Sequence, residues 1–184
     1  MTPISNYSVK AIKTFRARNG HGYSCNLLKD GKKVAEILEE GRGGELRVDW
    51  MDYTAKTTVI SNGYDSKEVS YQGTFEESLF HAQVMKLPKI PSNGDFPEMT
   101  TSVHIVIDDM VCDTLAMKKL MTNMKKSLAV KCKDGKILTW KFTPTHPEQI
   151  LRTLVLTKYP DGKIMNDLPI EESFQLYKEA GLVD

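Results

Sequence analysis

Cysteine is scarce in this sequence of 184 residues, and the thiols present are poorly placed for disulfides or metal binding. Cys25, Cys112 and Cys132 are odd in number and lie far apart, with no Cys-x-x-Cys pair and no nearby histidine at metal-ligand spacing. This pattern is typical of reduced thiols in the cytosol. We therefore predict a cytoplasmic protein without a disulfide framework.

Long apolar runs are also absent. No segment approaches the roughly 20 consecutive apolar residues that a membrane helix needs. The segment 1–15 does not place an apolar run after a basic one, as a secretory signal does. We expect no membrane partner and no secretion by an ordinary signal.

An excess of one charge sign is missing as well. The chain has 25 Lys and Arg against 24 Asp and Glu, a formal net charge of +1, so the molecule as a whole neither mimics a polyanion nor attracts nucleic acid. Any electrostatic function must come from a local patch. The content of 40% hydrophobic and 27% charged residues is that of a folded globular protein. The length fits a single domain over residues 1–184.

Motifs for catalysis are not found. None of His21, His81, His104 and His146 is four residues from another histidine, although such pairs on a helix mark many zinc hydrolases. There is no Gly-x-Ser-x-Gly elbow and no cysteine in a protease signature. We predict a protein that is not an enzyme, with no catalytic residue, no metal and no cofactor.

What the sequence does contain is a clear pattern of strands and tight turns in its first quarter. The predicted strands cover 9–17, 23–28, 33–38 and 45–50. Between them, Asn19-Gly20 and Asp30-Gly31 are dipeptides that tolerate positive φ and reverse the chain in hairpins. This pattern predicts an antiparallel β-meander.

The rest of the chain alternates helical and strand patterns. Weaker strands are expected at 57–60 and 68–71, and a hairpin joins 128–133 to 137–142. Helices are expected at 74–87 with Thr74 as the cap, at 107–126, at 147–159 and at 170–180. The whole predicts an α+β fold, in which the N-terminal meander packs with helices and a helix, a β-hairpin and C-terminal helices follow. The segment 88–102 has three prolines and is the candidate internal boundary.

Two of the expected helices carry apolar stripes. Within 147–159, the residues expected to face inward are Ile150, Leu151, Leu154 and Val155. Within 107–126, the methionines are Met110, Met117, Met121 and Met124. Because methionine is flexible and polarizable, this second stripe fits either the core or an adaptable surface that grips a partner.

A glycine-rich segment, Gly-Arg-Gly-Gly at 41–44, joins two of the predicted strands. Glycine-rich turns present backbone N–H groups that can bind phosphate. A phosphate loop of the Walker type ends in Gly-Lys-Ser/Thr and opens a helix, whereas here a strand follows. The segment is either a hairpin turn or a contact loop that uses Arg42.

Lysines concentrate near the end of the second expected helix and in the hairpin that follows. The residues are Lys118, Lys119, Lys125, Lys126, Lys131, Lys133 and Lys136. Lysines at the C-terminal end of a helix complement its dipole, so a solvated face explains them structurally. The alternative is a positive patch that binds phosphates or an acidic protein surface.

Acidic residues are grouped too, and Asp49 and Asp109 are candidates for a metal site built from dispersed carboxylates. Asp and Glu in the first turn of a helix are also what the helix dipole favours. The acidic residues therefore fit either a metal site or a structural role at the start of a helix.

The segment 19–50, NGHGYSCNLLKDGKKVAEILEEGRGGELRVDW, resembles a pattern in uncharacterised proteins of phages and plasmids of Gram-positive bacteria. The shared features are a strand, the turn at 30–35, an acidic pair, the glycine cluster and a strand ending in an aromatic residue. The latter part is similar too, with a lysine-rich helix end, a hairpin and a helix that closes on Lys158-Tyr159 before Asn166.

The resemblance implies a setting rather than a chemistry. Small accessory genes of this kind often encode inhibitors of restriction or CRISPR effectors. On a type II anti-CRISPR interpretation, the protein is a non-enzymatic inhibitor that binds a Cas9-like nuclease or its guide complex in the cytoplasm of the bacterial host. It would block DNA binding or cleavage by occlusion, which needs a surface and no active site.

Two other functions fit parts of the sequence. A nucleic-acid-binding accessory protein would contact nucleic acid directly through the Lys-rich region 118–136. A small metal-dependent nuclease would require activity that depends on Asp49 and Asp109.

Overall fold

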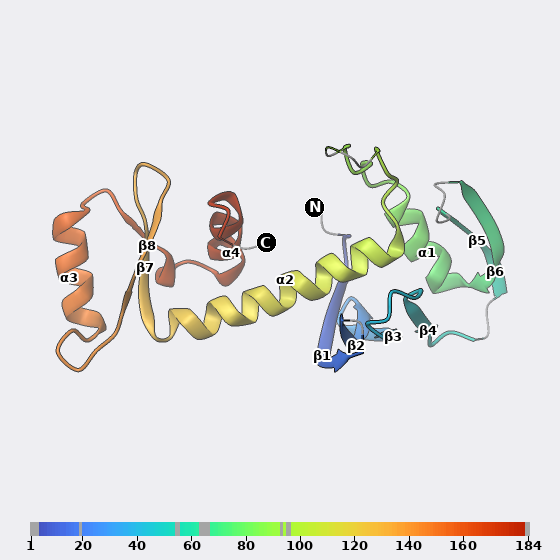
Figure 1. The fold of residues 1–184 in the computed structure, drawn as a ribbon, viewed down its shortest axis with the longest axis horizontal. Coiled ribbons are helices and arrows are strands. Elements are labelled where there is room, and N and C mark those ends of the chain that lie inside the picture. The colour runs from blue at the N-terminus through green and yellow to red at the C-terminus, as the bar shows by residue number, and fades with distance from the viewer. Residues whose placement is uncertain are drawn as a thin grey trace. The chain divides into compact units, whose positions relative to one another are not determined.

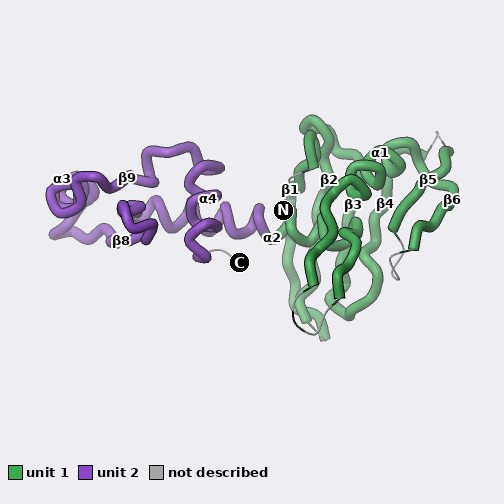
Figure 2. The backbone as a smooth tube through the Cα atoms, turned by 90° about the horizontal axis from the view of Figure 1, so that it is seen from above, with its two compact units in different colours: residues 1–112 green, residues 113–184 purple. Residues whose placement is uncertain are grey.

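The computed structural model describes residues 4–18, 20–53, 56–62, 67–92, 94 and 97–182. It has four α-helices and several antiparallel sheets over these residues, which confirms the predicted α+β class (Figure 1). The chain divides into two compact units, residues 1–112 and 113–184 (Figure 2). The division falls within a helix, whereas the proline-rich segment 88–102 belongs to the first unit.

The first unit contains the meander, a second hairpin and a helix. In chain order its elements are β1 (Tyr7–Ala17), β2 (Gly20–Lys29), β3 (Lys32–Glu39), β4 (Arg47–Trp50), β5 (Lys56–Asn62), β6 (Glu68–Thr74) and α1 (Phe75–Val84). Helix α2 (Val103–Met124) begins in the first unit and ends in the second.

The predicted meander is confirmed as a four-stranded antiparallel sheet of order β1-β2-β3-β4. Asp30 and Gly31 have φ of 48° and 79°, the left-handed values that a two-residue hairpin turn requires, and Lys29 pairs with Lys32 across it. The other dipeptide, Asn19-Gly20, includes a residue outside the described ranges. Local turn chemistry therefore determines at least the β2–β3 register.

One face of the meander is covered by helices. Its buried side chains include Leu27, Ala35 and Ile37, which share a hydrophobic core with the first part of α2 through Val106 and Ile107. Alternate residues of a strand point to opposite faces, so the polar residues between them meet solvent. This arrangement makes the meander the base on which the first unit is built.

Helix α1 packs against the meander on one side and against the β5–β6 hairpin on the other. Thr74 caps it as predicted, accepting a hydrogen bond from the Glu77 backbone N–H while the Glu77 carboxylate accepts one from the Thr74 N–H, at 3.1 Å each. Phe80 packs edge-on against Tyr7 and lies beside Trp50, with ring centroids 4.8 and 5.8 Å away. The two weakly predicted strands are present as β5 and β6, which pair in register.

The second unit is a small sheet between two helices (Figure 1). After the end of α2 come β7 (Ser127–Lys131), β8 (Ile137–Lys141), α3 (Glu148–Lys158), β9 (Lys163–Ile164), a 3₁₀ turn (Met165–Asp167) and α4 (Ile170–Glu179). The hairpin β7–β8 and the helices α3 and α4 confirm the predictions. The strand β9 was not predicted, because two residues give no recognisable pattern.

Asn166 holds three parts of this unit together. Its Oδ1 accepts a hydrogen bond from the Ala129 N–H at 2.8 Å, and its Nδ2 donates to the carbonyls of Met124 and Ser127 at 2.9 Å each. These groups lie at the end of α2 and in β7. One side chain therefore completes the backbone hydrogen bonding where the sheet meets the helix.

No helix among the described residues is both long enough and apolar enough to cross a membrane.

Candidate partner-binding surfaces

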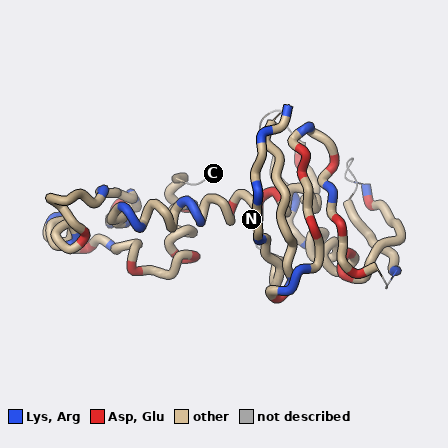
Figure 3. Tube along the Cα trace, turned by 90° about the horizontal axis from the view of Figure 1, so that it is seen from below, with Lys and Arg blue, Asp and Glu red and all other residues tan. Residues whose placement is uncertain are grey.

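Four of the seven predicted lysines lie together on α2 and the turn that follows it. We call Lys118, Lys119, Lys125 and Lys126 the α2 basic face. Lys118 and Lys119 lie in the last two turns of α2, and Lys125 and Lys126 follow directly in the turn after Met124. All four are exposed, and no ion pair is found for them among the described residues. They form blue bands along this end of α2 (Figure 3).

The three lysines of the hairpin have acidic partners. Lys131 Nζ lies 3.2 Å from Glu179 of α4, Lys136 Nζ lies 3.2 Å from Asp134, and Lys133 is 3.9 Å from Asp161. Exposed pairs of this kind add little stability, but they reduce the local positive charge. The predicted seven-lysine cluster is thus divided between an uncompensated helix face and a largely compensated hairpin.

Arg42 belongs to the first unit, in the loop between β3 and β4. Its side chain is 72% exposed and its Nε lies 3.9 Å from Glu40. Gly41 has φ of 67°, and a Cβ there would lie 2.7 Å from the backbone of β2. The close approach of the loop to β2 therefore explains this glycine structurally.

The methionine stripe is neither fully buried nor fully exposed. Met110 packs against the core of the first unit, Met117 and Met124 are half-buried, and Met121 is 43% exposed. Met121 lies between Lys119 and Lys125, and the exposed Leu115 lies about one helical turn before Lys118. Apolar side chains are therefore available beside the α2 basic face.

The acidic residues make structural contacts. Asp49 pairs with Arg47 at 2.9 Å, and Tyr7 and Lys29 contact Glu76. Within the described ranges, no group of three or more His, Cys, Asp or Glu side chains is placed to hold a metal ion. The hypothesis of a metal site at Asp49 and Asp109 is therefore not supported by any such group among these residues.

A polar cluster connects α2 to the meander within the first unit. The Tyr23 hydroxyl donates to Asp108, and His104 Nε2 lies 3.3 Å from both Asp108 and Glu39. Burial, followed by the hydrogen bond to Asp108, raises the pKa of Tyr23. These contacts explain Asp108 and His104 as residues that attach the helix to the sheet.

A second polar cluster lies between β6 and α1, with His81 buried and Tyr71 exposed. The Tyr71 hydroxyl donates to Glu77 at 2.9 Å and lies 3.5 Å from His81 Nε2. Burial lowers the pKa of His81, which favours the neutral ring. Its Nδ1 finds no hydrogen-bond partner among the residues that the structure describes.

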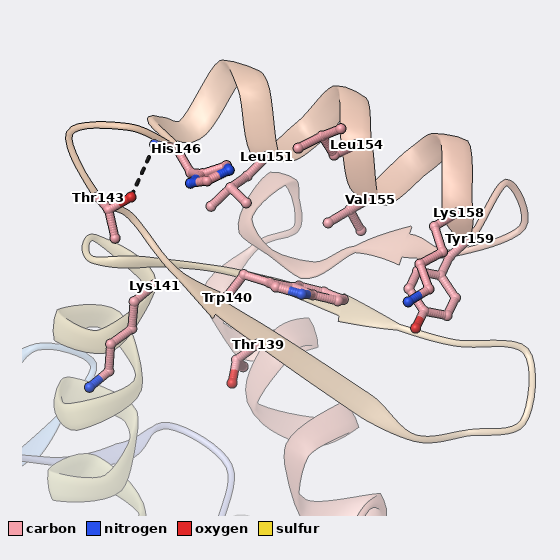
Figure 4. A pocket seen from close by; sticks show the side chains of 10 residues that line it. All are labelled: Thr139, Trp140, Lys141, Thr143, His146, Leu151, Leu154, Val155, Lys158 and Tyr159. Atoms are coloured by element: carbon pink, nitrogen blue, oxygen red, sulfur yellow. Dashed lines mark hydrogen bonds between the residues drawn. The ribbon is translucent and has the colours of Figure 1, made fainter.

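An open cavity lies in the second unit, between β8 and α3. It has a volume of about 510 Å³. Half of its ten lining residues are apolar or aromatic, and the other half are Thr139, Lys141, Thr143, His146 and Lys158. Figure 4 shows Trp140 lying flat beneath α3, with Leu151 and Val155 pointing toward it and Tyr159 at one end. The rings of Trp140 and Tyr159 are 5.9 Å apart at an angle of 46°. We call this cavity the Trp140 pocket.

The rim of the Trp140 pocket combines exposed apolar and basic side chains. Leu154 is 52% exposed and Ile150, one turn earlier on α3, is 46% exposed. Lys158 Nζ lies 5.6 Å from the centre of the Tyr159 ring, whereas the Lys141 side chain points away from α3. The lining residues include no carboxylate, so Lys158 is the cation beside the aromatic end of the pocket.

The prediction that Ile150 and Leu154 face inward is wrong, whereas Leu151 and Val155 are buried as expected. The sheet beneath α3 is narrow, with its third strand only two residues long. The sheet covers Leu151 and Val155 of the apolar stripe on α3 and leaves Ile150 and Leu154 exposed. The pocket was missed because its two walls are brought together only by folding; the surplus of apolar residues on α3 was the available signal.

No protein-family model matches this chain, and comparisons with curated proteins and with solved structures give no significant match. A proposal on function must therefore be argued from the surfaces described above and from the resemblance noted in the sequence.

Proposed function

We propose that the protein is a non-enzymatic binding inhibitor, encoded by a phage or mobile element, that blocks a Cas9-like defence effector in the cytoplasm of the bacterial host. The observation that carries this proposal is the α2 basic face, whose four exposed lysines make no ion pair with any residue in the described part of the chain. The partner implied by the resemblance is a nucleoprotein, which offers phosphates and acidic surfaces to such lysines.

The distribution of charge supports a binding surface in the second unit. Residues 113–184 contain 12 Lys and Arg against nine Asp and Glu, although the whole chain is nearly neutral. Complementary charge steers partners together and raises the rate of association. Apolar side chains beside the lysines, such as Leu115 and Met121, would add contact area that charge alone does not provide.

The mechanism we propose is occlusion at one inhibitor per effector. A bound protein that covers the path of the DNA prevents its binding or cleavage without breaking any bond. Inhibition should therefore reach completion at equimolar protein and should be reversed when the complex dissociates.

The test is affinity capture of the tagged protein from a bacterial lysate that contains an active CRISPR nuclease. It is done with and without nuclease digestion and at two salt concentrations. Recovery of the effector after the free nucleic acid is digested supports the proposal. Failure to recover any defence component would overturn it.

Two matched variants assign the binding to the α2 basic face. The first replaces its four lysines with alanine. The control replaces four lysines of the same unit that have acidic partners: Lys131, Lys133, Lys136 and Lys163. We expect capture to fall about tenfold or more in the first variant and to change little in the control. Equal losses would mean that net charge, and not this face, is responsible.

A second candidate function is supported by the same lysines. A nucleic-acid-binding accessory protein would use them to neutralise phosphates, each adding about −0.9 to the slope of log affinity against log salt on duplex DNA. Filter binding to a duplex of random sequence tests this. A steep slope that is lost in the four-lysine variant, with no effector recovered after digestion, would favour this function over the inhibitor.

A further inference from the structure

We infer that the Trp140 pocket receives an apolar anchor side chain from an acidic peptide segment of a protein partner. The inference rests on the proposed function, because it gives the chemistry of the partner surface that the inhibitor recognises. The apolar walls of the pocket, its exposed apolar rim and the Lys158 cation beside it each specify part of this ligand.

The pocket favours an apolar side chain over a nucleobase. Leu151 and Val155 form its roof and Trp140 its floor, while the Thr139 side chain points away from the helix (Figure 4). The polar lining lies at the ends of the pocket, where the His146 N–H donates to Thr143 Oγ1. A base placed between the helix and Trp140 would leave the donors and acceptors of its edge without partners, which costs free energy. A leucine or phenylalanine side chain has no such groups and fills an aromatic-lined cavity well.

The rim indicates that an acidic residue lies beside the anchor. Lys158 lies at the Tyr159 end of Trp140, is exposed, and has no ion pair among the described residues, whereas the Lys141 side chain points away from α3. An acidic segment would find the Lys158 cation beside its anchor, whereas a basic segment would be repelled. The exposed apolar pair Ile150 and Leu154 extends the contact along α3.

The test is selection from a displayed library of random dodecapeptides against the full-length protein. We expect enriched peptides that combine one aromatic or long aliphatic residue with Asp or Glu within a few positions. Enrichment should fall about tenfold or more on Leu154→Asp, because a carboxylate would line the pocket, and on Lys158→Glu, because the charge is reversed.

Leu156→Asp is the matched control for the pocket variant. Leu156 is 40% exposed on the same helix but does not line the pocket, so this substitution should leave enrichment within about twofold. The inference is overturned if no peptide is enriched, if the enriched peptides lack acidic residues, or if they bind Leu154→Asp as well as the wild type. Binding of a single-stranded oligonucleotide that displaces the selected peptides would also overturn it.

Effector capture separates this inference from the proposed function. If the wild type and Leu154→Asp capture the effector equally, the inhibitor function stands and the pocket plays no part in it. If acidic anchored peptides are selected but no effector is captured, the pocket binds a peptide and the proposed function fails. Loss of capture in Leu154→Asp but not in Leu156→Asp supports both.

Discussion

At Cys25, burial controls the reactivity of a single side chain. The thiol lies in β2 within the core of the first unit, where burial raises its pKa to about 11. Because the thiolate is the reactive species, we expect Cys25 to resist a thiol reagent at pH 8 while the exposed Cys112 reacts. Labelling with a disulfide reagent, followed by mass spectrometry of peptides, measures this. Equal rates at the two residues before denaturant is added would contradict it.

Asn166 is the residue at which one substitution should disturb the second unit most directly. Asn166→Ala removes three hydrogen bonds to backbone groups near the end of α2 and in β7. We expect the free energy of unfolding to fall by about 2–4 kcal/mol, because partly buried backbone groups lose their partners. Urea denaturation checks this value.

The matched control is Asn123→Ala. Asn123 lies nearby in the last turn of α2 with an exposed side chain, so its loss should change the free energy of unfolding by no more than about 0.5 kcal/mol. If Asn166→Ala were as mild as Asn123→Ala, the three hydrogen bonds would not support the junction.

The roles of single residues were the hardest part to predict from sequence. Asn166 appeared in the sequence only within a resemblance, because its three partners lie far from it along the chain. Similarly, nothing local distinguished Lys131, whose partner Glu179 is remote, from Lys125, which has no ion pair within the described ranges. Only folding decides which charges are compensated.

Among the elements, α1 gives the clearest case of a local signal that determines structure. Thr74 and Glu77 have the spacing of a capping box and form one. We expect Thr74→Ala to lower the free energy of unfolding by about 1 kcal/mol, because a backbone N–H at the helix start loses its acceptor. Ser78→Ala is the control, since its hydroxyl bonds to a carbonyl of the same helix and caps nothing. Thermal denaturation followed by circular dichroism should show a clear loss for Thr74→Ala alone.

Strand and helix positions were largely predictable because turn dipeptides, caps and apolar periodicity act over a few residues. It was harder to predict which residues of an amphipathic helix are buried against the rest of the protein. The stripe of α3 contains Ile150 and Leu154 as well as Leu151 and Val155, and periodicity treats them alike. Which side is covered depends on the width of the sheet beneath, which no local pattern in α3 records.

At the scale of the whole molecule, the question is how far the two units unfold together. Each has its own hydrophobic cluster, and each cluster is packed by one tryptophan: Trp50 in the first unit and Trp140 in the second. Labelling with 5-fluorotryptophan gives two resonances that report on the two units separately. This makes the predicted single domain over residues 1–184 directly testable.

We expect Leu128→Ala to lower the urea midpoint reported by Trp140 more than the midpoint reported by Trp50. Leu128 is fully buried in the second cluster, and truncation of such a residue costs about 2–5 kcal/mol through lost contacts and a residual cavity. Ile37→Ala, in the first cluster, should have the opposite pattern, and the exposed Leu156→Ala should move neither midpoint. Equal shifts of both resonances in both core variants would contradict separate unfolding and would mean that α2, which belongs to both units, transmits the loss of one core to the other.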